Sequence, residues 1–383
     1  MRIQEELPEG KQHEDSGRTC GEGNDMKAQD HGGDVYSASY RLDFSVSVNP
    51  LGTPHSVRHA VIRSTGSLEQ YPDVQCRDLC RKLSDKLHIP AHWITCGNGA
   101  AELIFAAAHA VHPKCALLIC PGFSEYEKAL RSAACEDIRF YLCPRKDGFR
   151  IGEDILGQIT EDIDMMYLSN PANPTGILTD PALMVRILEK CRDNHVVLVV
   201  DECFLELTAR PAEHTMLGYI ADSPNLLILR SFTKTFAMPG VRLGFCATSN
   251  RKLTDRIRDS VQPWPVSIPA QMAGEAALGE AEYLKESRDI IGRELRYLRQ
   301  MFERIGIRCY DSEANFLFFE GPDNLFEQCA KKGILIRDCR NYRGLGQGYY
   351  RVSVHTRRDN EELCGILSNI FKTKGHYLTD EMH

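Results

Sequence analysis

The sequence predicts an α/β protein with two unequal domains, a large one built on a mostly parallel sheet and a smaller one of α+β type. Its 383 residues exceed the size at which a single core stops growing, roughly 250–300 residues. Short apolar runs alternate with amphipathic stretches between residues 93 and 248, the pattern of βαβ units. A long charged helical segment and several short strands follow Trp264-Pro265, which predicts the smaller domain.

The predicted elements follow from these patterns in chain order. In the large domain, we expect strands at 116–120, 165–169, 196–200, 226–229 and 244–247. The helices between them are expected at 99–112, 124–134, 151–160 and 180–194. A single connecting helix from about 271 to 305 has apolar residues spaced near 3.6, and strands are expected near 307–310, 315–319, 335–336 and 350–354.

The domain organisation is predicted from composition along the chain. Residues 1–30 are rich in polar and charged side chains and have almost no large apolar ones, so we expect a disordered leader. Residues 31–60 are predicted to form an N-terminal arm and part of the small domain. Residues 61–270 are assigned to the large domain, and residues 271–383 to the connecting helix and the small C-terminal domain.

Composition and charge exclude several classes of function. The chain is 43% hydrophobic and 26% charged, with a net charge of −7 and acids and bases mixed along its length. It therefore has no basic stripe that would follow a nucleic-acid backbone. There is no run of about 18 apolar residues, and the N-terminus lacks the basic and then apolar pattern of a signal peptide. We expect a cytoplasmic protein that binds neither nucleic acid nor membrane.

Cysteine is unusually frequent, with fifteen residues in the chain. The closest pairs, Cys76/Cys80 and Cys115/Cys120, lack the CxxC spacing of zinc or redox sites. Other cysteines lie inside apolar, strand-like runs, namely Cys120, Cys203 and Cys246. We therefore expect reduced and mostly buried thiols, which behave as small hydrophobic side chains, and no metal site.

The most informative stretch is residues 231–244, where Lys234 follows a predicted strand. Hydroxyl residues flank this lysine, and Arg242 lies eight positions further on. A lysine after a strand is by itself usually a surface residue. Here, however, an amine nucleophile is accompanied by the Ser and Arg donors that bind phosphate, which are the groups a phosphorylated aldehyde requires.

This stretch resembles the cofactor-lysine signature of the class I and II aminotransferases, pyridoxal-phosphate enzymes of fold type I. The resemblance implies that Lys234 holds pyridoxal 5′-phosphate (PLP) as a Schiff base, while Ser231 and Arg242 bind its phosphate. Asp201 ends the apolar run 196–200, at the edge of the sheet where ligands usually bind. It either caps the following turn or, paired with Lys234, contacts the pyridine nitrogen of the cofactor.

Further cofactor ligands are implied by the same resemblance. Residues 170–176 are a turn-rich loop that resembles the Asn-Pro-Thr-Gly turn of the family, whose asparagine, here Asn173, hydrogen-bonds the phenolic oxygen of PLP. Many relatives also have a tyrosine three residues after the aspartate, where this chain has Phe204. In the family, the turn matching 96–102 opens a helix whose first amides bind the phosphate. The candidates here are Gly99, Ala100 and Ala101.

Two aromatic residues complete the expected cofactor site. Phe123 is the candidate for stacking on the pyridine ring, although an aromatic residue after a strand is more often part of the core. Tyr71 lies in a Tyr-Pro-Asp segment that resembles the one through which relatives give a tyrosine hydroxyl to the cofactor phosphate of the neighbouring subunit. This implies a homodimer with shared active sites.

The segment 333–354 resembles threonine-phosphate decarboxylases of cobalamin biosynthesis, which are related to histidinol-phosphate aminotransferases. His31-Gly32-Gly33 and residues 43–52 match the same family, so the resemblance extends from about residue 30 to 370. Arg337 and Arg351 are each ordinary salt-bridge residues if considered alone. Together they suit a substrate with two anionic groups, because guanidinium binds carboxylate and phosphate bidentately. By resemblance, His31 and Gly32 join this pocket, with His31 as a phosphate donor, and Asn173 helps to orient the substrate there.

The predicted reaction is decarboxylation of L-threonine O-3-phosphate to (R)-1-amino-2-propanol O-2-phosphate. One departure concerns Ser47, which stands where the decarboxylases typically have a substrate-binding asparagine. Transamination of the histidinol-phosphate type and decarboxylation of a related substrate such as serine phosphate therefore stay open as alternatives. A cofactor-binding transcription regulator is disfavoured, because thirty polar residues cannot form a DNA-binding domain.

Overall fold

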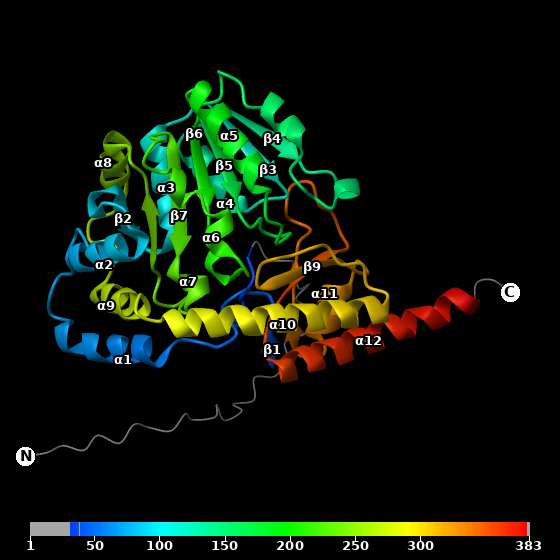
Figure 1. The fold of residues 1–383 in the computed structure, drawn as a ribbon. Helices are drawn as coiled ribbons and strands as arrows, with labels where there is room; N and C mark the ends of the chain where they lie inside the picture. The colour runs from blue at the N-terminus through cyan, green and yellow to red at the C-terminus, as the bar shows by residue number, and fades with distance from the viewer. Residues whose placement is uncertain (1–30, 38, 381–383) are drawn as a thin grey trace, which may run out of the picture.

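The computed structural model describes residues 31–37 and 39–380, with side chains up to residue 372. A large sheet with helices packed around it lies above a smaller unit, and a long helix runs along the base of the sheet and into the smaller unit (Figure 1). The expected disordered leader, residues 1–30, lies outside the described residues. The predicted α/β class is confirmed.

The large sheet has seven strands in the order β2-β8-β7-β6-β5-β3-β4. Every neighbouring pair is parallel except the two pairs that β8 makes, which are antiparallel. The strands are β2 (Ile94–Gly97), β3 (Cys115–Cys120), β4 (Asp137–Leu142), β5 (Met165–Ser169), β6 (Val197–Asp201), β7 (Leu226–Ser231) and β8 (Gly244–Ala247). The five predicted strands agree with β3 and β5 to β8, whereas β2 and β4 were not predicted. β4 is an edge strand with mostly accessible side chains, so it lacks a continuous apolar run.

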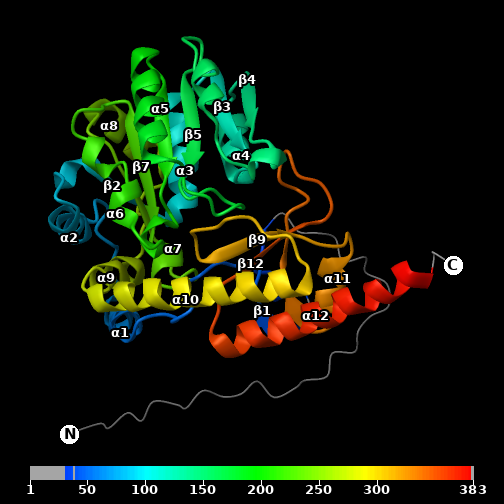
Figure 2. The ribbon, with the colours of Figure 1, turned by 45° about the vertical axis from the view of Figure 1, so that its right-hand side comes forward.

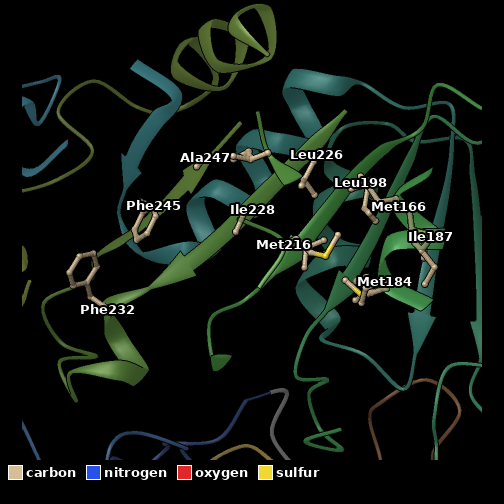
Figure 3. Close-up of a cluster of buried hydrophobic side chains, with 14 of the residues drawn as sticks. Met166, Met184, Ile187, Leu198, Met216, Leu226, Ile228, Phe232, Phe245 and Ala247 are labelled. Carbon is tan, nitrogen blue, oxygen red and sulfur yellow. The ribbon is translucent and has the colours of Figure 1, made fainter. Parts of the chain in front are cut away.

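Both faces of this sheet are buried, because alternate residues of each strand point to opposite faces. Figure 3 shows Met166, Leu198 and Ile228 side by side on one face, with Met184 and Ile187 of α5 (Pro181–Asp193) near them. The residues between them belong to a second cluster with α3 (Gly99–Val111) and α4 (Ser124–Ser132). Continuous apolar runs in the sequence are the consequence of this double burial.

The remaining helices of the large unit pack around the same sheet or extend from its ends. They are α1 (His55–Ser64), α2 (Arg77–Leu87), α6 (Pro211–His214), α7 (Phe232–Thr235), α8 (Arg251–Ser260) and α9 (Ile268–Ala277). The helix predicted at 151–160 is wrong, because only a short 3-10 helix forms at Glu153–Gly157. Gly152 precedes this segment and Gly157 is its last residue, and glycine disfavours an α-helix by about 1 kcal/mol per residue.

The predicted single helix from 271 to 305 is also wrong. The chain forms α9 and then α10 (Ala281–Ile305), with a turn around Gly279 between them. α9 begins earlier than predicted, where the Ser267 side chain accepts a hydrogen bond from the Ala270 amide. The strand expected at 307–310 is reduced to an isolated bridge between Cys309 and Phe319.

The smaller unit contains a three-stranded antiparallel sheet in the order β11-β12-β9. Its strands are β9 (Phe316–Glu320), β11 (Arg337–Asp338) and β12 (Tyr349–Ser353), and its helices are α11 (Leu325–Ala330) and α12 (Arg357–Asp380). β1 (Leu42–Asp43) pairs in parallel with β10 (Ile334–Leu335), so the N-terminal arm joins this unit. α12 packs along α10, as both views show (Figures 1 and 2). The boundaries at residues 60 and 270 stay predictions.

The prediction that the thiols are mostly buried is confirmed for the described part of the chain. All fourteen cysteines there are free, and twelve of them are buried, whereas Cys135 and Cys309 are partly exposed. Cys20 lies outside the described residues. In the ranges 31–37 and 39–380, no helix combines the length and the apolar composition needed to cross a bilayer.

The packing of the smaller unit yields a prediction for stability. Phe302 of α10 is fully buried. Its ring packs edge-on against the ring of Phe319 of β9, with 5.0 Å between the two ring centroids. Phe302→Ala leaves a cavity and should lower the free energy of unfolding by about 3–5 kcal/mol. Urea unfolding measures this, with Leu68→Ala, whose side chain is 69% exposed, as the control expected within about 0.5 kcal/mol of the parent. Equal urea midpoints for the two variants would contradict the prediction.

Candidate active site

A cavity of about 260 Å³ lies at the carboxyl ends of the central parallel strands. β5, β6 and β7 end at Ser169, Asp201 and Ser231, and all three residues line it. This is the edge of an open α/β sheet at which ligands bind, because loops diverge there after each strand. The N-terminal arm and the smaller unit contribute the opposite wall, including Arg337 and Arg351.

Lys234 is half-buried in this cavity and lies in α7, the short helix directly after β7. Its carbonyl oxygen accepts a hydrogen bond of 3.0 Å from the Asn49 amide. The Asn49 side chain also donates to the Thr235 carbonyl at 2.8 Å and to Ser287 Oγ of α10 at 2.7 Å. Segments far apart in the sequence therefore fix the turn that presents the lysine.

The environment of Lys234 favours its neutral form. Burial lowers the pKa of Lys234 to about 8, and the positive charge of Arg351 acts in the same direction. The Phe204 ring centroid lies 6.0 Å from Lys234 Nζ, and this ring has no oxygen with which to hydrogen-bond the amine. A lysine with a lowered pKa is an effective amine nucleophile near neutral pH.

Donors suited to a phosphate gather around the N-terminus of α3. Ala100 and Ala101 of its first turn line the cavity, together with Ser231, Thr233 and Arg242. Among the described residues, no side chain caps this helix, so its first amides are available to a ligand. The region combines the positive end of the helix dipole with a guanidinium and two hydroxyl groups.

Two glycines allow close packing around the N-terminus of α3. At Gly99, φ is +77°, and a Cβ there would lie 2.7 Å from Arg242 Nη2. At Gly244 of β8, a Cβ would lie 2.5 Å from the Ala100 amide nitrogen. Gly99 itself is not among the residues lining the cavity, unlike Ala100 and Ala101. The lack of a side chain at Gly99 therefore allows Arg242 to lie close to the helix.

Both oxygens of the Asp201 carboxylate are hydrogen-bonded. Oδ1 accepts from the Cys203 amide at 2.9 Å, so this residue does cap the following turn. Oδ2 accepts from the Tyr126 hydroxyl at 2.7 Å. Burial and the charge of Asp201 raise the pKa of Tyr126 well above its ordinary value, so its hydroxyl stays protonated and donates. Asp201 also lines the cavity, so the turn-capping and ligand-facing interpretations are compatible.

The two predicted arginines are direct neighbours. Arg337 and Arg351 are Cα partners in the antiparallel pair β11–β12, and their side chains are 4% and 6% exposed. Arg351 donates from Nη1 to Asn173 Oδ1 at 2.5 Å and from Nη2 to the Ser45 carbonyl at 3.0 Å. Its Nε is buried without a hydrogen-bond partner in the described structure. Arg337 donates to Asn341 Oδ1 at 2.9 Å.

The N-terminal arm brings further predicted residues to the cavity. His31 Nε2 lies 3.0 Å from Glu125 Oε1, and a Cβ at Gly32 would lie 2.5 Å from the Ser45 carbonyl oxygen. Ser47 is 1% exposed, and no described group hydrogen-bonds its hydroxyl. His31, Gly32 and Ser47 all line the cavity, as Phe123 and Asn173 do.

Tyr71, like Gly99, is a predicted site residue that does not line this cavity. Its side chain is 78% exposed and stacks on Trp264 at 4.5 Å between ring centroids. Its expected role at the site of a second subunit stays a prediction. The lining residues that were missed include Tyr126 and Tyr342, and the Tyr342 hydroxyl contacts Asn173 Oδ1 at 3.3 Å. The spacing of Tyr126 three residues after Phe123, on one helix face, was the available signal for the first.

The sequence matches the family described as aminotransferase class I and II over residues 41–367. The chain belongs to this family. Its members are pyridoxal-phosphate enzymes, and this aminotransferase-family protein is accordingly a PLP-dependent enzyme. The predicted family and cofactor are both confirmed.

Similar proteins differ in the reaction that their names give. Threonine-phosphate decarboxylase of Salmonella typhimurium is 35% identical over 352 residues, covering 89% of this chain and 96% of that protein. Histidinol-phosphate aminotransferase 1 of Cupriavidus pinatubonensis is 30% identical and covers 85% and 86%. The crystal structure of the histidinol-phosphate aminotransferase from Clostridium acetobutylicum has a TM-score of 0.81 at 29% identity, covering 87% of this chain and 99% of that one. The predicted fold type I is thereby confirmed.

The lowered pKa of Lys234 predicts the pH dependence of cofactor capture. Apoprotein should attach PLP covalently at a rate that rises through a midpoint near pH 8, because the neutral amine accumulates above that pKa. Arg351→Met removes a cationic charge and should move the midpoint to higher pH. Arg343→Met makes the same charge change at a half-exposed residue that does not line the cavity, and should leave it in place. A parent midpoint near 10.5, the ordinary lysine value, would refute this account.

Proposed function

We propose that this enzyme decarboxylates a phosphorylated amino acid, with L-threonine O-3-phosphate as the leading substrate. The observation that carries the proposal is the pair Arg337 and Arg351, buried side by side in the cavity that also holds Lys234. Two neighbouring guanidinium groups suit a small substrate with two anionic groups. The 35% identity to a threonine-phosphate decarboxylase supports the same substrate class.

The residues of the cavity fit PLP. Ser231, Arg242 and the first amides of α3 are assigned to its phosphate. Lys234 provides the amine for its aldehyde. Asp201 is assigned to the pyridine nitrogen, which its negative charge would keep protonated. When bound, PLP supplies an electron sink for the pair of electrons left when a bond to the substrate Cα breaks.

Two further residues are assigned to the cofactor ring. The Asn173 carbonyl oxygen accepts from Arg351 and Tyr342, which orients the amide NH₂ as a donor for the phenolic oxygen. Phe123 lines the cavity beside His31, at 6.1 Å between ring centroids, and is assigned to stacking on the pyridine ring. Phe204 contributes no hydroxyl, so Asn173 would stabilise the phenolic oxygen without the help of a tyrosine at that position.

The arginines divide the anionic groups of the substrate between them. Among the surrounding charges, that of Arg351 lowers the pKa of Lys234 most, so Arg351 is the cation assigned to the carboxylate on Cα. Its unpaired buried Nε is a donor available for this contact. Arg337, with His31 and the Gly32 backbone, is assigned to the phosphate. Ser47 Oγ, also without a partner in the described structure, faces the same pocket as a small hydroxyl donor.

Orientation selects the bond that breaks. With its carboxylate held by Arg351 and its phosphate by Arg337, the substrate would be placed so that the bond between Cα and the carboxyl carbon breaks and CO₂ leaves. Lys234, after accepting a proton from the substrate ammonium group, would return that proton to Cα, which gives an aminoalkyl phosphate. The reaction thus depends chiefly on positioning and electrostatics by the protein.

Transamination is the competing function, and the relatives at 29–30% identity named as histidinol-phosphate aminotransferases favour it. It would use the same lysine, but to move the proton of Cα and not to replace a departing carboxyl group. We also propose a homodimer in which Tyr71 gives its hydroxyl to the cofactor phosphate of the second subunit. The 78% exposure of Tyr71 in the single chain is compatible with this role.

Product analysis distinguishes decarboxylation from transamination. The holoenzyme is incubated with threonine phosphate, serine phosphate or histidinol phosphate, with and without 2-oxoglutarate. We expect CO₂ from threonine phosphate with no need for 2-oxoglutarate, because no amino-group acceptor takes part. Lys234→Ala should abolish both turnover and the visible absorbance of bound PLP. Glutamate without CO₂ would show an aminotransferase instead.

Arg337→Met tests the binding of the phosphate. Loss of a charged hydrogen-bonding partner costs about 1.5–3 kcal/mol, so kcat/KM for threonine phosphate should fall by about 10- to 100-fold. The value for unphosphorylated threonine should change little, since it lacks the group that Arg337 binds. Arg343→Met, outside the cavity, should keep the parent ratio of the two substrates. An unchanged ratio in Arg337→Met would remove Arg337 from the phosphate site.

A further inference from the structure

Three thiols form a cluster that the proposed reaction does not use. Cys76 is the N-cap residue of α2, Cys80 lies one turn further along that helix, and Cys96 is in β2. The Sγ atoms of Cys80 and Cys96 are 3.8 Å apart. The side chains are 2%, 7% and 5% exposed, respectively. Nothing in the cofactor chemistry requires three thiols at this place.

The paired thiols differ in acidity, as a reactive pair requires. The hydrogen bond with Cys96 lowers the pKa of Cys80 in spite of its burial, and the positive charge of Arg258 acts in the same direction. Hydrogen bonds with Cys76 and Cys80, together with burial, raise the pKa of Cys96 well above its ordinary value. Cys80 is therefore the better nucleophile and Cys96 the proton donor.

The cluster is reached through a cavity of its own. All three thiols line it, with Arg77, His92 and Arg258, and it shares no lining residue with the cavity of Lys234. In the described part of the chain, no group of three His, Cys, Asp or Glu side chains is placed to hold a metal ion. A small oxidant can reach the thiols through this cavity, and the thiols are not placed to hold a metal ion. This arrangement favours thiol oxidation.

We propose that Cys80 and Cys96 form an oxidative modification site that closes to a disulfide with hydrogen peroxide. The Cys80 thiolate attacks one peroxide oxygen, an S–O bond forms, the O–O bond breaks, and the departing hydroxide takes a proton to become water. Cys96 sulfur then attacks Cys80 sulfur, an S–S bond forms, and the S–O bond breaks with loss of a second water. In sum, two thiols and one peroxide give one disulfide and two waters.

Formation of the disulfide moves the backbone segment that leads from Cys96 to the amides assigned to the cofactor phosphate. The sulfur atoms must approach by about 1.8 Å to reach the S–S length of about 2.05 Å. Cys96 is followed by the turn that begins α3, and this turn is tightly packed. A Cβ at Gly97 would lie 2.8 Å from Leu103 Cγ, and one at Gly244 would lie 2.5 Å from the Ala100 nitrogen. Tightening β2 against α2 therefore displaces Ala100 and weakens PLP binding.

The disulfide is independent of the proposed function, whereas its effect on PLP rests on the assignment of the α3 amides to the phosphate. By thermodynamic linkage, bound PLP must oppose the disulfide by the same factor by which the disulfide weakens PLP. A coupling of 1.4 kcal/mol corresponds to a tenfold change. We therefore expect a dissociation constant for PLP about tenfold higher in the oxidised enzyme, restored by dithiothreitol.

The test uses the holoenzyme treated with hydrogen peroxide. Remaining thiols are blocked, and the protein is digested without reduction for mass spectrometry, while PLP retention is followed by absorbance. We expect a Cys80–Cys96 linked peptide and loss of PLP. Cys80→Ser and Cys96→Ser should prevent both changes. Cys135→Ser, which removes a partly exposed thiol outside the cluster, should prevent neither.

The outcomes separate the two parts of the proposal without any substrate assay. A disulfide from Cys76 to either partner, or no disulfide when Cys80 is fully oxidised, would overturn the Cys80–Cys96 site. A Cys80–Cys96 disulfide with unchanged PLP affinity would overturn its coupling to the cofactor. Cys80→Ala is a second variant that lacks this thiol, and its PLP spectrum before oxidation shows whether it has folded. Loss of PLP from oxidised Cys80→Ala would assign that loss to another residue.

Discussion

The parallel pairing of β5, β6 and β7 is the constraint on which the candidate site depends. Parallel strands in register end at one edge of the sheet, and here the pairing aligns Ser169 with Asp201, and Asp201 with Leu229 near the end of β7. The polar residues that follow each apolar run therefore converge, although they are about thirty positions apart in the chain. Burial of both faces of the sheet in apolar layers holds this edge in place.

Arg351 connects the smaller unit to this edge. Its guanidinium hydrogen-bonds Asn173 of the large unit and the Ser45 carbonyl of the N-terminal arm, while its strand pairs with that of Arg337. The same charge helps to lower the pKa of Lys234. A displacement of β12 would therefore change the substrate pocket and the basicity of the lysine together. In the proposed function, one side chain would both bind the anionic substrate and help to keep the Lys234 amine neutral.

Local sequence was sufficient where a function needs a short string in a fixed local geometry. Lys234 and Ser231 belong to one strand-to-helix turn, and Asp201 ends an apolar run, so all three were predicted from the sequence, and all three line the cavity. Segments without such a string were predicted less well. The expected helix at 151–160 gave way to a 3-10 turn between glycines, and the expected helix at 271–305 divided near Gly279, because helical spacing alone does not locate breaks.

The sequence by itself determined the α/β class, the family and its cofactor, because apolar periodicity and the lysine string are local properties. Only the tertiary structure decided that Tyr126 donates to Asp201, 75 positions away, and that Tyr342 meets Asn173. It also decided that Cys80 and Cys96, which are 16 positions apart in the chain, face one another. The physical reason is that chain folding, not proximity in sequence, sets which side chains meet across strands and helices.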